Sequence, residues 1–124
     1  MPLLATQPEA GIVNISSGLA IAPKRTAPVY CATKAALRTF TTALRYRCED
    51  LTATLRVCDV VMDYTETGMT AGRGGHKLSA RQAAHEVVAG IERDRDEIWV
   101  GRTRWLGLLH RLSPSRARRL MRQG

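Results

Sequence analysis

"GIVNISS" at residues 11–17 and "PVYCATKAALRTF" at residues 28–40 decide the fold of this chain. The first stretch is a short β-branched run introduced by Gly11, which is typical of a buried strand over residues 11–16. Apolar residues recur at helical spacing through the second stretch and beyond it, which predicts a helix over residues 29–48. A strand that leads into a long helix is therefore expected.

The rest of the chain repeats this alternation. Residues 54–62 are strand-like, the polar residues 63–77 predict a loop, and residues 97–101 predict a third strand. Ser79 is a suitable N-cap for a helix that ends near Arg93. Strands that alternate with helices of this length indicate an α/β fold, in which a parallel sheet is joined by right-handed crossovers.

The composition is that of an ordinary soluble domain. The 124 residues are 44% hydrophobic and 24% charged, which is enough chain to bury one core. No apolar stretch is long enough to span a bilayer, and the first residues lack the features of a signal peptide. The three cysteines and three histidines follow neither a disulfide nor a metal-binding spacing. These features indicate a cytoplasmic protein with reduced cysteines and no metal site.

The net charge of +8 is concentrated at one end of the sequence. Residues 102–124 hold seven arginines and no acidic residue, whereas residues 1–101 hold twelve basic and eleven acidic residues. Trp105, Leu108, Leu109 and Leu112 follow helical spacing within the basic segment. We therefore divide the chain into a domain and a basic amphipathic tail. Such a tail can pack on the domain or lie on an anionic membrane surface, and the lack of a base-reading motif disfavours nucleic acid.

Three polar residues mark a candidate site near the start of the predicted helix. Tyr30 and Lys34 are four residues apart, so their side chains lie on one helix face. Ser17 follows the first strand, and ligands bind at the carboxyl ends of the strands in open parallel sheets. A lysine ammonium favours the phenolate form of a nearby tyrosine, which allows a tyrosine to act as an acid or base near neutral pH. The three residues suit proton transfer to an oxygen atom.

"IVNISSGLA" and "PVYCATKAALRTFTTALR" together resemble the short-chain dehydrogenase/reductase family, from the strand with its active-site serine through the helix with its YxxxK motif. "EVVAGIERDRDEIWVG" is similar to the branch of cell-envelope-biogenesis oxidoreductases in that family. The resemblance covers residues 3–112. It implies a Rossmann-like parallel sheet with crossover helices and an NAD(P)-dependent oxidoreductase that interconverts a carbonyl and an alcohol.

The resemblance also implies a role for each site residue. Tyr30 would be the catalytic acid/base, Lys34 would hold the nicotinamide ribose, and Ser17 would orient the oxygen of a small carbonyl or alcohol substrate. Thr65 and Thr67 fall where the family contacts the nicotinamide carboxamide. The substrate, the choice between NAD and NADP, and the direction of the reaction are not predicted.

The chain departs from the family pattern in two places. Met62 and Asp63 stand where the family has Pro-Gly or Pro-Pro, which loosens the backbone that presents the carboxamide contacts. Asp63 is then either an unpaired carboxylate near the cofactor or a side chain that points into solvent. The strand, glycine-rich turn and helix that receive the cofactor pyrophosphate in the family are absent from the sequence.

The chain thus resembles the C-terminal half of a family member, a partial Rossmann-like domain over residues 1–101 without the dinucleotide fingerprint. Its first strand would lie at a sheet edge with uncovered apolar surface. The family counterpart of helix 29–48 packs in a dimer interface, so we expect a homo-oligomer through this helix. Three interpretations stay open: an oxidoreductase that is truncated and weak or inactive alone, a non-catalytic dimerisation module, and a basic membrane-associated module.

Overall fold

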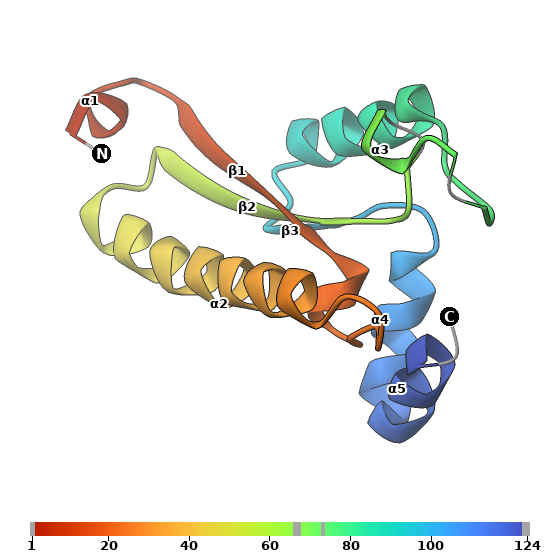
Figure 1. Ribbon diagram of the computed structural model, residues 1–124. Coiled ribbons are helices and arrows are strands. Elements are labelled where there is room, and N and C mark those ends of the chain that lie inside the picture. The colour runs from red at the N-terminus through yellow and green to blue at the C-terminus, as the bar shows by residue number, and fades with distance from the viewer. Residues whose placement is uncertain (1, 66–67, 73, 123–124) are drawn as a thin grey trace.

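Three parallel strands form a sheet in the computed structural model, which describes residues 2–65, 68–72 and 74–122 (Figure 1). The strands are β1 (Ala10–Ser17), β2 (Leu55–Met62) and β3 (Glu97–Trp99), in the spatial order β1-β2-β3. The middle strand, β2, pairs with β1 along one edge and with β3 along the other. The predicted α/β fold with a parallel sheet is therefore confirmed.

Helices cover both faces of this sheet (Figure 1). On one face α2 (Pro28–Leu51) packs against β1 and β2, and on the other α3 (Ala80–Glu92) packs against β2 and β3. The remaining elements are short: α1 (Pro2–Ala5), the 3-10 turns η1 (Gly18–Ala20) and η2 (Gly68–Thr70), α4 (Thr103–Leu112) and α5 (Pro114–Arg122). In Figure 1, α4 and α5 lie together at one end of the sheet.

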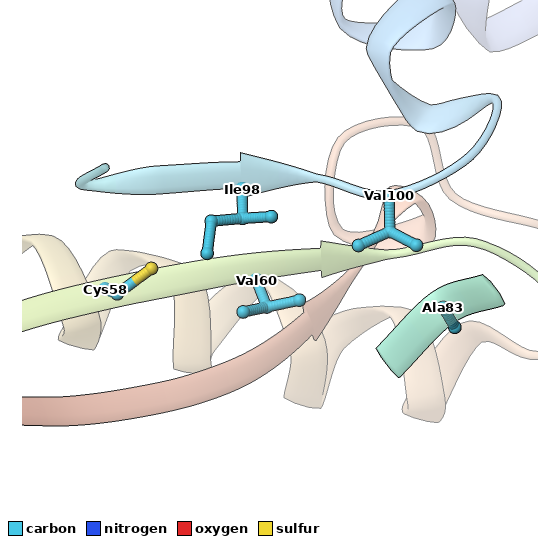
Figure 2. Close-up of a cluster of buried hydrophobic side chains, with 5 residues drawn as sticks. All are labelled: Cys58, Val60, Ala83, Ile98 and Val100. Carbon is cyan, nitrogen blue, oxygen red and sulfur yellow. The ribbon is translucent and has the colours of Figure 1, made fainter. Parts of the chain in front are cut away.

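Two apolar clusters hold the helices to the sheet. Figure 2 shows the cluster on the α3 side, which consists of Cys58, Val60, Ala83, Ile98 and Val100. On the α2 side, Cys48 packs with Leu55 and Val57. Successive residues of a strand point to opposite faces, and most residues of β2 are buried. Both faces of β2 are therefore covered, which explains its nearly continuous apolar sequence.

All three cysteines are free and buried. Burial, with a further contribution from the neighbouring Asp59 carboxylate, raises the pKa of the Cys58 thiol to about 11. A thiol that stays protonated at neutral pH is a poor nucleophile, so Cys58 serves as a packing residue.

The helix α2 and the strand β3 differ most from their predicted bounds. The helix α2 begins at Pro28, where the missing N–H costs nothing in the first helical turn, and it continues to Leu51, three residues past the predicted end. The strand β3 ends at Trp99, two residues early. Gly101 adopts a φ of +62°, which turns the chain out of the strand direction toward α4.

Ser79 caps α3 as predicted from the sequence. Its hydroxyl accepts a hydrogen bond from the backbone N–H of Gln82, and the Gln82 side chain accepts one from the backbone N–H of Ser79. This reciprocal capping box satisfies two backbone donors and fixes where the helix begins.

The strand β1 has one strand neighbour within the described residues. Val13 and Ile15 on one of its faces are 38% and 40% exposed. On the other face, the Asn14 side-chain amide donates a hydrogen bond to the Thr41 hydroxyl of α2 at 2.9 Å. The expected edge strand with a partly uncovered apolar face is therefore present.

Candidate active site

The candidate site lies at the carboxyl end of β1, where the chain enters η1 on its way to α2. Ser17 is the last residue of β1 and is 8% exposed. Its Oγ accepts a hydrogen bond from the backbone N–H of Leu19 at 3.1 Å. Because the oxygen is the acceptor in this bond, the hydroxyl proton can be donated to another group.

Lys34 connects the end of β1 to Tyr30. Its Nζ donates a hydrogen bond to the Ile15 carbonyl at 2.8 Å and lies 5.7 Å from the centroid of the Tyr30 ring. Ile15 precedes Ser17 by two residues in β1, so the lysine ties the helix face that bears Tyr30 to the strand that ends at Ser17. Tyr30 is 43% exposed and is therefore accessible to a ligand.

Arg38, one turn further along α2, binds two carboxylates of the sheet. Its guanidinium pairs with Asp59 of β2, and its Nη2 donates to Glu97 of β3 at 2.9 Å. The guanidinium carbon, Cζ, also lies 5.1 Å from the centroid of the Trp99 ring. Arg38 and Asp59 are not among the site residues predicted from the sequence, although an acidic residue inside the apolar run of β2 signals a buried partner.

Asp63 is held by an ion pair and by backbone hydrogen bonds. Its carboxylate accepts from the backbone N–H groups of Tyr64 at 2.7 Å and Arg102 at 2.9 Å, and its Oδ2 lies 3.1 Å from the Arg102 guanidinium. The Asp63 side chain is 13% exposed. Both alternatives predicted for this residue, an unpaired carboxylate and a side chain in solvent, are therefore wrong. Asp63 and Arg102 are 39 residues apart, so their ion pair cannot be predicted from local sequence spacing.

These contacts also fix the start of the basic tail to the domain. Arg102 is bound to the residue that follows β2, and the Thr103 hydroxyl donates to the Val61 carbonyl of β2 at 3.0 Å. Burial alone would raise the pKa of the Asp63 carboxyl, but the hydrogen bonds from Arg102 and Tyr64 outweigh burial and hold the pKa below its ordinary value.

Replacing Asp63 by asparagine is expected to lower the free energy of unfolding by about 1–2 kcal/mol at pH 7, because charge-assisted hydrogen bonds are lost. The folded-state pKa is depressed, so the carboxylate contributes its stability above the unfolded pKa of about 4 and loses it as pH falls through the folded pKa. Urea unfolding of both proteins should therefore show a difference at pH 7 that shrinks at pH 3. A difference that is independent of pH would contradict this assignment.

The family model described as short chain dehydrogenase matches residues 1–77. The chain belongs to the short-chain dehydrogenase family. It is similar to the uncharacterized oxidoreductase DltE of Bacillus subtilis (strain 168), with 34% identity over 103 residues that cover 78% of this chain and 40% of DltE. This similarity agrees with the predicted branch of the family.

The fold of this short-chain dehydrogenase chain is also found in a solved structure. A short chain dehydrogenase from Burkholderia cenocepacia J2315, crystallised in complex with NADP, matches 97% of this chain with a TM-score of 0.87 and 22% identity. This likeness shows the Rossmann-like fold and confirms that prediction. The chain spans half of that structure and 40% of DltE.

The loop after β2 holds the remaining predicted site residues of this short-chain dehydrogenase chain. The Thr65 hydroxyl donates to the Asp63 carbonyl at 3.0 Å, and the Thr65 carbonyl accepts from the Thr70 hydroxyl at 2.7 Å. Within the described residues, no hydrogen bond joins Thr65 to the residues at the end of β1. Thr67 lies outside the described residues.

In the part of this short-chain dehydrogenase chain that the structure describes, no helix has both the length and the hydropathy needed to cross a membrane. The same residues contain no group of three or more His, Cys, Asp or Glu side chains that could hold a metal ion.

Proposed function

We propose that this chain carries the proton-transfer part of an NAD(P)-dependent oxidoreductase site that interconverts a carbonyl and an alcohol. In this proposal Tyr30 is the acid/base, Lys34 binds the nicotinamide ribose, and Ser17 binds the substrate oxygen. The observation that carries the proposal is the position of the Lys34 ammonium, which contacts the end of β1 and faces the Tyr30 ring.

The geometry of Lys34 suits two tasks at once. An ammonium has three N–H donors, and the Ile15 carbonyl takes one of them, which leaves two for the hydroxyls of a ribose. Its positive charge also stabilises the negative charge that develops on Tyr30 as the proton leaves. Membership of the short-chain dehydrogenase family and the NADP complex of the Burkholderia protein support NAD(P) as the cofactor.

The proton follows a short path in this proposal. During reduction the Tyr30 hydroxyl donates its proton to the carbonyl oxygen of the substrate, while the Ser17 hydroxyl donates a hydrogen bond to the same oxygen. During oxidation the Tyr30 phenolate accepts the proton of the alcohol. A bound nicotinamide supplies or accepts the hydride. The Leu19 N–H fixes the Ser17 oxygen on one side, so that the hydroxyl proton is directed elsewhere.

The described residues fit one end of the cofactor and not the other. Lys34 and Tyr30 offer donors for the nicotinamide ribose, and Thr65 is the candidate contact for the carboxamide. The glycines between β2 and α3, Gly68, Gly72, Gly74 and Gly75, lie in a long connection and not in the tight strand-to-helix turn that binds a pyrophosphate. We therefore expect this chain alone to bind the cofactor weakly and to turn over slowly or not at all.

Titration of the purified 124-residue chain with NADH or NADPH is expected to show saturable binding by cofactor fluorescence. A Tyr30→Phe, Lys34→Ala double variant is expected to bind at least about tenfold more weakly, because the ribose loses its donors and the bound cation is gone. A Tyr46→Phe, Arg47→Ala variant also removes one phenol hydroxyl and one side-chain cation, at exposed positions of α2, and it should bind like the unchanged chain. Undetectable binding, or equal binding by all three proteins, would contradict the proposal.

A non-catalytic dimerisation module is the second candidate, because α2 carries an exposed apolar face. Val29, Phe40 and Leu51 are 75%, 58% and 64% exposed, and their spacings of eleven residues place them on one side of the helix. A second copy of the chain is the proposed occupant of this face. Dimerisation in analytical ultracentrifugation without any cofactor binding in the titration would favour this module over the oxidoreductase.

A further inference from the structure

The outer face of α4 carries an apolar ridge formed by Trp105, Leu108 and Leu112. The three residues are spaced by three and four positions, so they share one face of the helix. They are 67%, 49% and 78% exposed. Three large apolar side chains on one face of this ten-residue helix form a surface that the described chain leaves largely uncovered.

The opposite face of α4 is anchored in the domain. The Thr103 hydroxyl lies within hydrogen-bond distance of the Val61 and Val100 carbonyls, which share its single proton. Gly107 lies so close to Trp99 that a Cβ at this position would be 2.6 Å from the Trp99 ring. Because these contacts fix the rotation of α4, the ridge cannot turn inward to pack on the domain. The three ridge residues therefore do not pack on the domain, whereas Leu109 of the same helix is half-buried.

Among the residues that the structure describes, most arginines of the tail have no acidic side chain paired with their positive charge. Arg102 pairs with Asp63, and Arg104 pairs with Glu86. In the described part of the tail, the other arginines form no ion pair: Arg111, Arg116, Arg118, Arg119 and Arg122. The packing of α4 and α5 therefore leaves a strong positive field at this end of the molecule.

A hollow of about 600 Å³ between α5 and the start of α2 adds to this field. Arg118 and Arg122 line it from α5, and Lys24 and Arg25 line it from the loop before α2. No acidic side chain of the described chain lines the hollow. The hollow therefore places two basic residues of the loop before α2 at the same end of the molecule as the arginines of α5.

We propose that α4 and α5 lie on an anionic lipid bilayer, with the ridge among the acyl chains and the arginines at the lipid phosphates. Basic amphipathic helices with exposed tryptophan and leucine bind such surfaces by combining apolar burial with electrostatic attraction. Nucleic acid would satisfy the arginines but leave the ridge in water. A second copy would cover the ridge but bring two sets of arginines together. This inference is independent of the proposed catalytic function.

Sedimentation of the 124-residue chain with lipid vesicles tests this inference. The chain should bind vesicles of phosphatidylcholine that contain roughly one third phosphatidylglycerol, bind less as salt rises, and stay in solution with phosphatidylcholine alone. A Trp105→Gln, Leu108→Gln, Leu112→Gln variant should bind anionic vesicles at least about tenfold more weakly. An Arg116→Gln, Arg119→Gln variant should also bind more weakly.

The matched control is a Val88→Gln, Ile91→Gln variant, which removes apolar side chains that are 52% and 43% exposed on α3. It should bind vesicles like the unchanged chain, and circular dichroism should show that all variants are folded. No binding to anionic vesicles, or equal binding by the ridge variant, would overturn the proposal. Tight binding to duplex DNA that the ridge variant retains, without vesicle binding, would assign the arginines to nucleic acid instead.

Discussion

Replacing Arg38 by alanine is expected to lower the free energy of unfolding by about 3–5 kcal/mol at pH 7. The guanidinium pairs with Asp59, which is 1% exposed, and with Glu97. Without Arg38 the Asp59 carboxylate stays buried and loses its cation, which is strongly unfavourable. Asp59 Oδ1 has no hydrogen-bond partner among the described residues, so no other group compensates. Urea unfolding followed by circular dichroism measures the difference.

Two further variants separate this effect from a general loss of charge. Arg56 pairs with Asp94 at 3.3 Å, and both side chains are 57% exposed, so Arg56→Ala should change the free energy of unfolding by less than about 1 kcal/mol. An Arg38→Met, Asp59→Leu double variant removes both charges and should recover most of the stability lost in Arg38→Ala. If Arg38→Ala costs no more than Arg56→Ala, the buried pair does not stabilise the fold.

The ion pairs of Arg38 also help to position the residues of the candidate active site. Tyr30, Lys34 and Arg38 follow one another at intervals of four residues on α2, so they share one helix face. Lys34 binds β1, while Arg38 binds carboxylates of β2 and β3. The same helix face therefore fixes α2 to all three strands. Because Tyr30 lies on this face, the contacts that stabilise the fold also set the position of the proposed acid/base.

The sequence predicted the elements of the fold because their signals are local. β-branched runs bounded by glycine and polar loops marked β1 and β2, and the i, i+4 spacing placed Tyr30 beside Lys34. Ser79 and Gln82 form a capping box within four residues. Each of these features depends on residues that are neighbours along the chain, so periodicity and capping rules suffice to find them.

The pairs that the sequence did not predict join segments that are distant along the chain. Asp63 and Arg102 are 39 residues apart, and Arg38 and Glu97 are 59 residues apart. Their meeting depends on the parallel register of the strands and on the sharp turn at Gly101, and neither can be calculated from local spacing. A charged residue in an apolar run, as at Asp59, indicates that a partner exists but not which residue it is.

Replacing Gly90 by valine is expected to lower the free energy of unfolding by about 2–3 kcal/mol. Gly90 is buried in α3 against Ile98 of β3, and a Cβ there would lie 2.5 Å from Ile98 Cγ1 and 2.9 Å from Cγ2. Ile98 is 4% exposed and its branched side chain has few alternative rotamers, so it cannot move away cheaply. Thermal unfolding followed by circular dichroism measures the loss.

A double-mutant cycle shows whether close packing is the reason for this glycine. Glycine inside a helix costs about 1 kcal/mol relative to alanine, so Gly90 needs a compensating advantage, and close contact between α3 and β3 provides it. Ala84→Val, at an exposed position of the same helix, should cost only about 0.5 kcal/mol. Ile98→Ala removes the contacting atoms, so in that background Gly90→Val should be neutral or stabilising. Equal costs in both backgrounds would mean that backbone conformation, and not the contact with Ile98, requires glycine here.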